Sequence, residues 1–310
     1  MESPVKLGFV PASRTIFDQG LAVAAREAVL GVMRAAGVDP VVPGPDSTTN
    51  GLVQTAEEAG KAARLFAEEG TAGVVVGALN FGNEIPAALA ALASGKPVLI
   101  FGMGEHGLLD RGSRRDAFCG LISIATALRH RKARYCFPRR AVGSPADFVS
   151  AFDEFARVCK AVGEVKGAVY GQLGPRPADF ETCAYDELSL LGKFGIRVVP
   201  LPLSTIYARA AYASEPRVRS VYREMDESVT REIATDLDLS KMARLEVVLE
   251  DIIDLYGLSG MAVQCWTSFQ DDYGISPCFV MARLTDRGFP CACEADIHGV
   301  ISMHLLSLLT

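Results

Sequence analysis

The chain has 310 residues, of which 49% are hydrophobic, and it carries a net charge of −6 with a pI near 5.4. This length predicts two domains with ordinary cores, and the acidic balance argues against a protein that binds nucleic acid. The longest apolar run, Ala72 to Leu79, is far shorter than the roughly 20 residues of a spanning helix. Because the N-terminal stretch is also too short and too acidic for a secretory signal, we expect a cytoplasmic protein without a membrane segment.

Eight cysteines are scattered along the chain without a C-x-x-C pair, which predicts reduced thiols rather than a disulfide framework. Cys291 and Cys293 form the closest pair. No histidine stands at zinc-ligand spacing from them, so we interpret both as packing residues rather than as a soft-metal site.

The first half of the chain alternates short apolar strands with helices. Apolar residues recur at helical spacing from Leu21 to Ala36, and the capping box Thr55-Ala56-Glu57-Glu58 opens a second helix that closes at Gly70. We predict strands at 5–10, 41–42, 74–76 and 98–101. This β-α-β order is typical of a parallel sheet with helices on both faces.

A domain boundary is predicted near residue 166. Ser144-Pro145 opens a helix with an apolar stripe from Phe148 to Val162, and a new α/β cycle begins at Gly167. In the second half we predict strands at 168–170, 196–201 and 261–265, one helix ending at 194 and another running from 240 to 256. The prediction is two successive Rossmann-like, flavodoxin-like domains with parallel sheets, 1–165 and 166–310, the second incomplete at its C-terminus.

Two other patterns have ordinary interpretations. The G-x-G-x-x-G match from Gly102 to Gly107 follows the fourth strand and has no acid about 20 residues on, so we reject a dinucleotide site and with it an NAD-dependent oxidoreductase. The basic segment from Arg129 to Arg140 is interpreted as a solvated loop or a subunit contact, because it lacks an interleaved aromatic platform for bases.

The strongest candidate for chemistry is Glu294, which follows an apolar strand just where a helix begins. Strand ends in open α/β sheets commonly carry the functional site. Glu294 and Asp296 also have an ordinary interpretation as acids at a helix N-terminus, stabilised by the helix dipole. His298 and His304 lie six residues apart, about 240° around a helix, and so cannot form a metal pair.

The stretch from Gln264 to Gly299, QCWTSFQDDYGISPCFVMARLTDRGFPCACEADIHG, resembles the signature of the L-fucose isomerase family, relatives of the arabinose isomerases. The resemblance implies an aldose–ketose isomerase that moves a proton between C1 and C2 of a sugar. It implies that Glu294 is both a ligand of Mn²⁺ or another divalent cation and the acid/base group, with Asp296 and His298 supporting the site indirectly.

The same resemblance implies substrate-binding residues. Gln264 and Trp266 would lie near the sugar, although core packing stays open for the only tryptophan. Arg14, in the loop after the first strand, would reach the substrate of a neighbouring subunit, which implies a homo-oligomer with active sites at subunit interfaces. No role is assigned to the similar segment Leu79 to Glu84, and the Gly174-Pro175-Arg176-Pro177 turn is interpreted as a rigid start of the second domain.

The family's remaining metal ligands, an aspartate after the last helix and a histidine in a further domain, have no counterpart in these residues. The apolar terminal helix from Ile301 to Leu306 is also expected to leave one face without a following element to bury it. We therefore expect a fragment of a longer enzyme, lacking the family's C-terminal domain and inactive alone. The alternative is a sugar-binding or regulatory module without chemistry.

Overall fold

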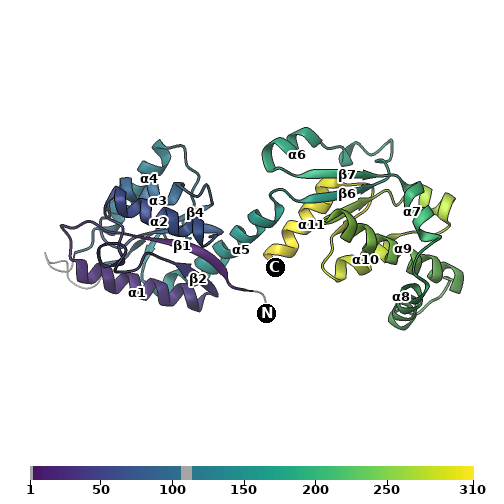
Figure 1. Cartoon of the computed structure of the whole chain (residues 1–310), viewed down its shortest axis with the longest axis horizontal. Helices are drawn as coiled ribbons and strands as arrows, with labels where there is room; N and C mark the ends of the chain where they lie inside the picture. The colour runs from purple at the N-terminus through teal and green to yellow at the C-terminus, as the bar shows by residue number, and fades with distance from the viewer. Residues whose placement is uncertain (1–2, 106–113) are drawn as a thin grey trace. The chain divides into compact units, whose positions relative to one another are not determined.

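The computed structural model describes residues 3–105 and 114–310, and the chain divides into two compact units, Met1–Gly163 and Glu164–Thr310. Each unit is a parallel sheet with helices packed on it (Figure 1). The predicted α/β class with two successive parallel-sheet layers is confirmed.

The first unit contains a five-stranded parallel sheet in the order β2-β1-β3-β4-β5, the flavodoxin-like order. Its strands are β1 (Val5–Ala12), β2 (Val38–Val41), β3 (Gly73–Ala78), β4 (Val98–Met103) and β5 (Val142–Gly143). Its helices are α1 (Gln19–Ala35), α2 (Ala56–Glu68), α3 (Glu84–Leu92), α4 (Ala117–His130) and α5 (Val149–Val165), with short 3₁₀ turns at Thr49–Gly51 and Pro145–Phe148.

Helices cover both faces of this sheet, with α1 on one side and α2, α3 and α4 on the other (Figure 1). The packing is close enough to require glycine at Gly8, where a Cβ would meet the Phe66 ring of α2 at 2.8 Å. The predicted capping box of α2 is present, since the Glu58 amide donates to Thr55 Oγ1 at 3.2 Å and the Thr55 amide donates to Glu58 Oε2 at 3.1 Å.

The described part of the glycine motif lies within and just after the fourth strand. Gly102 lies inside β4, where it pairs with Val142 of β5, and Gly104 follows the strand end. His106 and Gly107, the rest of the motif, lie outside the described residues.

The second unit contains a four-stranded parallel sheet in the order β7-β6-β8-β9. Its strands are β6 (Val169–Leu173), β7 (Arg197–Leu201), β8 (Gly260–Val263) and β9 (Cys291–Ala292). Its helices are α6 (Glu187–Phe194), α7 (Leu203–Ala210), α8 (Glu215–Ser228), α9 (Asp236–Tyr256), α10 (Cys278–Asp286) and α11 (Ile297–Leu309), with a 3₁₀ turn at Glu181–Cys183 and a π-helical turn at Phe269–Tyr273.

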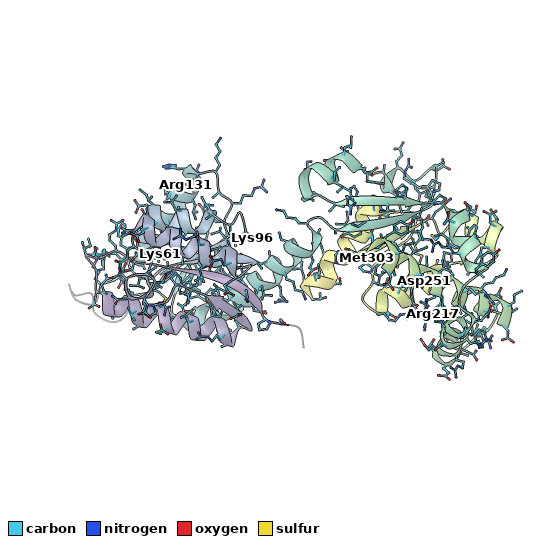
Figure 2. All side chains as sticks on the ribbon, in the orientation of Figure 1. Lys61, Lys96, Arg131, Arg217, Asp251 and Met303 are labelled. Atoms are coloured by element: carbon cyan, nitrogen blue, oxygen red, sulfur yellow. The ribbon has the colours of Figure 1, made fainter. Side chains whose placement is uncertain are left out.

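The terminal helix α11 packs on its own sheet through its first turns. Ile297 and Val300 are fully buried in a cluster with Tyr170 of β6, and Met303, labelled in Figure 2, packs at the edge of that cluster. His304 is half-buried and contacts the Tyr170 hydroxyl through Nδ1 at 2.8 Å. Leu306 is 62% exposed, so the apolar surface of this helix is covered only in part.

Candidate functional site

The C-terminal edge of the second sheet brings together three segments that are far apart in sequence. Gly174 follows β6, Gln264 and Trp266 follow β8, and Glu294 follows β9. The connection after β6 crosses to β7 on one side, while the connection after β8 leads to β9 on the other. Such a change of direction between neighbouring strands leaves a crevice at their carboxyl ends, where open α/β sheets bind ligands.

Glu294 is held at this edge in a left-handed backbone conformation. Its φ is +58°, and Ala295 follows with φ +54°. The Ala295 amide donates to the Val263 carbonyl of β8 at 3.0 Å, which fixes the backbone beside the neighbouring strand. Left-handed backbone at residues other than glycine costs about 1–2 kcal/mol each and is concentrated at functional sites.

The Glu294 carboxylate is only half satisfied by the described part of the chain. Its Oε1 accepts a hydrogen bond from the Cys265 thiol at 3.3 Å. Its Oε2 is buried and has no hydrogen-bond partner among the described residues. Buried polar atoms nearly always have a hydrogen-bond partner. This oxygen can therefore still bind a further group, such as a substrate hydroxyl, a water or a cation.

The cysteines near Glu294 are neutral thiols at physiological pH. Burial raises the pKa of Cys265 to about 12, so its sulfur keeps the proton that it donates to Glu294. Burial likewise raises the pKa of Cys291 to about 12 and raises that of Cys293. Within residues 3–105 and 114–310, no group of three or more His, Cys, Asp or Glu side chains is arranged to hold a metal ion.

Asp296, not Glu294, caps helix α11. Its Oδ1 accepts a hydrogen bond from the Gly299 amide at 2.8 Å, which satisfies one of the free donors at the helix N-terminus. The capping role that the sequence left open for this pair of acids is therefore filled by Asp296, and the Glu294 carboxylate has no capping contact in the structure.

Gln264 and Trp266 lie where β8 ends. The backbone amide of Gln264 donates to the Leu173 carbonyl at 2.8 Å. The Gln264 side chain lies close to Gly174, because a Cβ at Gly174 would be 2.4 Å from Gln264 Oε1. Trp266 is 54% exposed, and its ring centroid is 6.0 Å from that of Phe180. Core packing is therefore wrong for Trp266, which presents an aromatic surface at the sheet edge.

His298 is exposed on the first turn of α11, and its ring meets the edge of Tyr185 at 6.5 Å between centroids. The Tyr185 hydroxyl in turn donates to Gln172 Oε1 at 2.7 Å. The described contacts of His298 thus lead to β6 rather than to Glu294. Sequence reasoning missed Tyr185 and Gln172, although a glutamine inside an apolar strand is a signal that could have found the second.

Arg14 lies in the first unit, after β1. Its Nη2 is 2.8 Å from Glu84 Oε2, its Nε donates to the Gly82 carbonyl at 3.1 Å, and its guanidinium lies 4.4 Å from the Phe81 ring centroid. The segment 79–84, for which sequence analysis assigned no role, therefore holds this arginine in place. A hollow of about 380 Å³ adjoins it, lined by Arg14, Gln54, Thr55, Ala56, Asn83, Glu84, Ile85 and Pro86.

The basic segment from Arg129 to Arg140 borders an apolar hollow of about 460 Å³ on α4. Phe118, Ile122 and Phe137 line this hollow and are exposed. Arg131 extends into solvent (Figure 2) and donates through Nη1 to the Ala127 carbonyl at 2.9 Å.

The fold is that of an α/β protein with two parallel sheets, and the carboxyl ends of the second sheet are the candidate site. The model of the fucose/sulfoquinovose isomerase N-terminal domain matches residues 8–166, about half of the chain. The chain therefore belongs to the fucose/sulfoquinovose isomerase family, as its resemblance to fucose isomerases predicted. Glu294 and the other residues of the second sheet edge lie outside the matched range.

Curated relatives are sulfoquinovose isomerases. Those of Alkalicoccus urumqiensis and Priestia aryabhattai are 27% and 26% identical to this chain over 69% and 68% of its length. A sulfoquinovose isomerase of a Clostridium strain is 23% identical over 69% of the chain. The chain spans about half the length of these relatives, 47–48%.

A solved fructose-binding periplasmic domain of a hybrid two-component system aligns with 98% of this chain at 12% identity. The alignment includes 94% of that domain and has a TM-score of 0.21. That score is too low to carry an argument. In the described ranges, no helix is long and apolar enough to cross a membrane.

Proposed function

We propose that this chain is part of an aldose–ketose isomerase that transfers a proton between C1 and C2 of a sugar, and that the sugar is sulfoquinovose or a close analogue. Family membership and the names of the relatives support the reaction class. The observation that carries the site assignment is the buried Glu294 Oε2, which no described residue satisfies at the edge where such sheets bind ligands.

In this proposal Glu294 is the acid/base group. An ionised carboxylate can take the proton from one sugar carbon and return it to the next, provided that it stays within hydrogen-bond reach of both. The Cys265 thiol holds Oε1, which leaves Oε2 as the atom that receives the proton. Gln264 would hydrogen-bond a sugar hydroxyl and Trp266 would stack on the apolar face of the ring, while Arg14 would serve the site of a neighbouring subunit.

A divalent cation such as Mn²⁺ would polarise the sugar carbonyl when bound. The residues described here do not form such a site alone. Mn²⁺ prefers several oxygen ligands, whereas Glu294 Oε2 is the one buried carboxylate oxygen without a partner among the described residues, and it lies beside protonated thiols. We propose that Glu294 supplies one ligand and that the others come from residues outside the described ranges, so that residues 1–310 alone do not turn over substrate.

A sugar-binding or regulatory module is the second candidate. The incomplete set of metal ligands favours it, because Gln264 and Trp266 can bind a sugar without any proton transfer. In that case the free oxygen of Glu294 would accept a hydrogen bond from a sugar hydroxyl.

We also propose that the protein is a cytoplasmic homo-oligomer. All eight cysteines are free thiols, which favours a reducing compartment. The exposed Phe118, Ile122 and Phe137 beside the basic segment favour contact with a second copy. A monomer in light scattering at micromolar concentration would contradict the oligomer.

The test is conversion of sulfoquinovose to its ketose, followed by NMR with added Mn²⁺. The protein is expressed from the whole reading frame that encodes this chain, and residues 1–310 are assayed beside it. We expect conversion by the whole product and none by residues 1–310. Sugar binding without conversion by the whole product would favour the module. Conversion by residues 1–310 would refute the proposal that the other metal ligands come from outside the described ranges.

A further inference from the structure

The loops that follow the four strands of the second sheet contain a single permanently charged cation, Arg176. These loops comprise residues 174–186, 202, 264–277 and 293–296, all of which the structure describes. They contain no lysine and no other arginine, whereas acidic side chains recur among them. A negatively charged ligand bound at this edge would find one full positive charge within these loops, and Lys241 of α9 brings an ammonium group close to Gly274 and Tyr273 from outside them.

The loop that carries Arg176 is attached at both ends to the segment with the proposed sugar-binding residues. At its start, Gly174 contacts the Gln264 side chain, and the Gly174 amide donates to the Leu201 carbonyl at 2.9 Å. Six residues later the Phe180 ring packs against Trp266, with 6.0 Å between centroids. Arg176 lies between these two contacts, so its backbone is tied to the strand end that presents Gln264 and Trp266.

The guanidinium of Arg176 has donors to spare. It is half-buried, and its Nη1 donates to the carbonyls of Pro177 and Ala178 at 3.2 and 3.4 Å. A guanidinium has five N–H donors, and within the described part of the chain this one forms no ion pair with a carboxylate. Its own loop contains Asp179 and Glu181, and both are exposed.

Two other arginines of the same unit, Arg217 and Arg283, have their charge compensated by carboxylates. Arg217 on α8 lies against Asp251 of α9 (Figure 2) and bonds Glu250 at 2.9 Å. Arg283 bonds the fully buried Glu246 at 2.8 Å. These pairs join helices to each other and explain why those arginines are present. The described hydrogen bonds of the Arg176 guanidinium stay within its own turn. Contact between helices therefore does not explain its charge.

We propose that Arg176 binds the anionic group of the substrate and gives the site its preference for a sulfonated over an uncharged sugar. A planar guanidinium donates two parallel hydrogen bonds to neighbouring oxygens of an oxyanion, which a sulfonate presents. Gln264 and Trp266 then contact the neutral part of the same sugar. This inference rests on the proposed function and names the chemical group that its site selects.

The test compares sulfoquinovose with quinovose, the same sugar without the sulfonate. Dissociation constants are measured by calorimetry on the whole-frame protein without metal, so that binding is separated from turnover. Wild type should bind sulfoquinovose about 10- to 100-fold more tightly than quinovose, as expected of a charge-assisted pair. Arg176→Gln should abolish that preference by weakening sulfoquinovose alone, and Arg176→Lys should retain part of it.

Arg219→Gln is the matched control, because Arg219 is exposed on α8 and its substitution removes the same charge. It should leave both constants unchanged. Equal affinity of wild type for the two sugars, or an Arg176→Gln variant with the wild-type ratio, would overturn the role of Arg176 while leaving the isomerase proposal intact.

If neither sugar binds, the proposed function fails, and methanesulfonate tests the anion site directly. In residues 1–310 labelled with ¹⁵N, methanesulfonate should shift the Nε–Hε resonance of Arg176 in a saturable way, and added salt should weaken the effect. The same titration should not move the Arg219 resonance. Absence of a saturable Arg176 shift would refute the site.

Discussion

At the scale of single residues, the two acids beside α11 have separate tasks. Their spacing predicted a pair at a helix N-terminus, but spacing could not say which one caps the helix. The structure gives that task to Asp296 and turns Glu294 toward β8 through a left-handed backbone. The sequence could not predict that backbone, because it depends on a hydrogen bond from Ala295 to Val263 of β8, 32 residues earlier.

Gly174 offers a residue-scale prediction for the sheet edge. Its φ of +78° disfavours a side chain, and a Cβ would also be 2.4 Å from Gln264 Oε1. We expect Gly174→Ala to lower the free energy of unfolding by about 2–4 kcal/mol, from about 1–2 for the backbone and the rest for overpacking. Urea unfolding followed by circular dichroism measures this change.

Gly257 is the matched control for that variant, since it has φ +58° and no atom within 4 Å of its Cβ position. Gly257→Ala should lower the free energy of unfolding only through its left-handed backbone, by about 1 kcal/mol. Equal losses in the two variants would show that the contact between Gly174 and Gln264 is not tight.

At the scale of elements, signals that are local in sequence gave correct helices and strands. The Thr55–Glu58 box opens α2 as predicted, because its partners lie three residues apart. Some observed element boundaries differ from the predicted ones. Helix α9 begins at Asp236 rather than at 240, since Thr235 and Asp238 form a capping box, and the strand predicted at 41–42 pairs as Val38–Val41. Helices α7 and α8 were missed.

The α2 capping box has a pH signature. Burial tends to raise the pKa of Glu58, but hydrogen bonds from the amides of Thr49, Gln54 and Thr55 outweigh it and lower the pKa below its ordinary value of 4.5. The folded state therefore holds the ionised form. The resulting stability is present above pH 4.5 and is lost as pH falls through the lowered pKa.

We expect Glu58→Gln to reduce the free energy of unfolding by about 0.5–2 kcal/mol at pH 7, and to reduce it less as pH falls below 4.5. Denaturant unfolding of both proteins between pH 3 and 7 measures the difference. Glu57→Gln is the control, since Glu57 is exposed and bonds only Lys61 at 3.0 Å. A difference between wild type and Glu58→Gln that stays constant with pH would contradict the account.

At the scale of the whole molecule, the sequence predicted the α/β class, the two parallel sheets and the isomerase family. Hydrophobic periodicity and β-α order are properties of short segments, which explains the first two. The candidate site was predicted only in part. Glu294, Gln264 and Trp266 follow strands at one sheet edge, and Arg14, predicted to serve a neighbouring subunit, lies in the first compact unit bonded to Glu84. Long-range contacts such as the thiol of Cys265 on Glu294 leave no local pattern.

The most direct measurement of the central claim is the effect of Glu294→Gln on the protein expressed from the whole reading frame. The amide keeps the shape of the side chain but removes the charge and the basic oxygen. We predict that kcat falls by about 10²–10⁴-fold, that Mn²⁺ binds more weakly, and that the melting temperature without metal stays unchanged. Asp296→Asn, which keeps a capping side chain, should leave kcat near normal. Near-normal turnover of Glu294→Gln together with a lowered melting temperature would contradict the account.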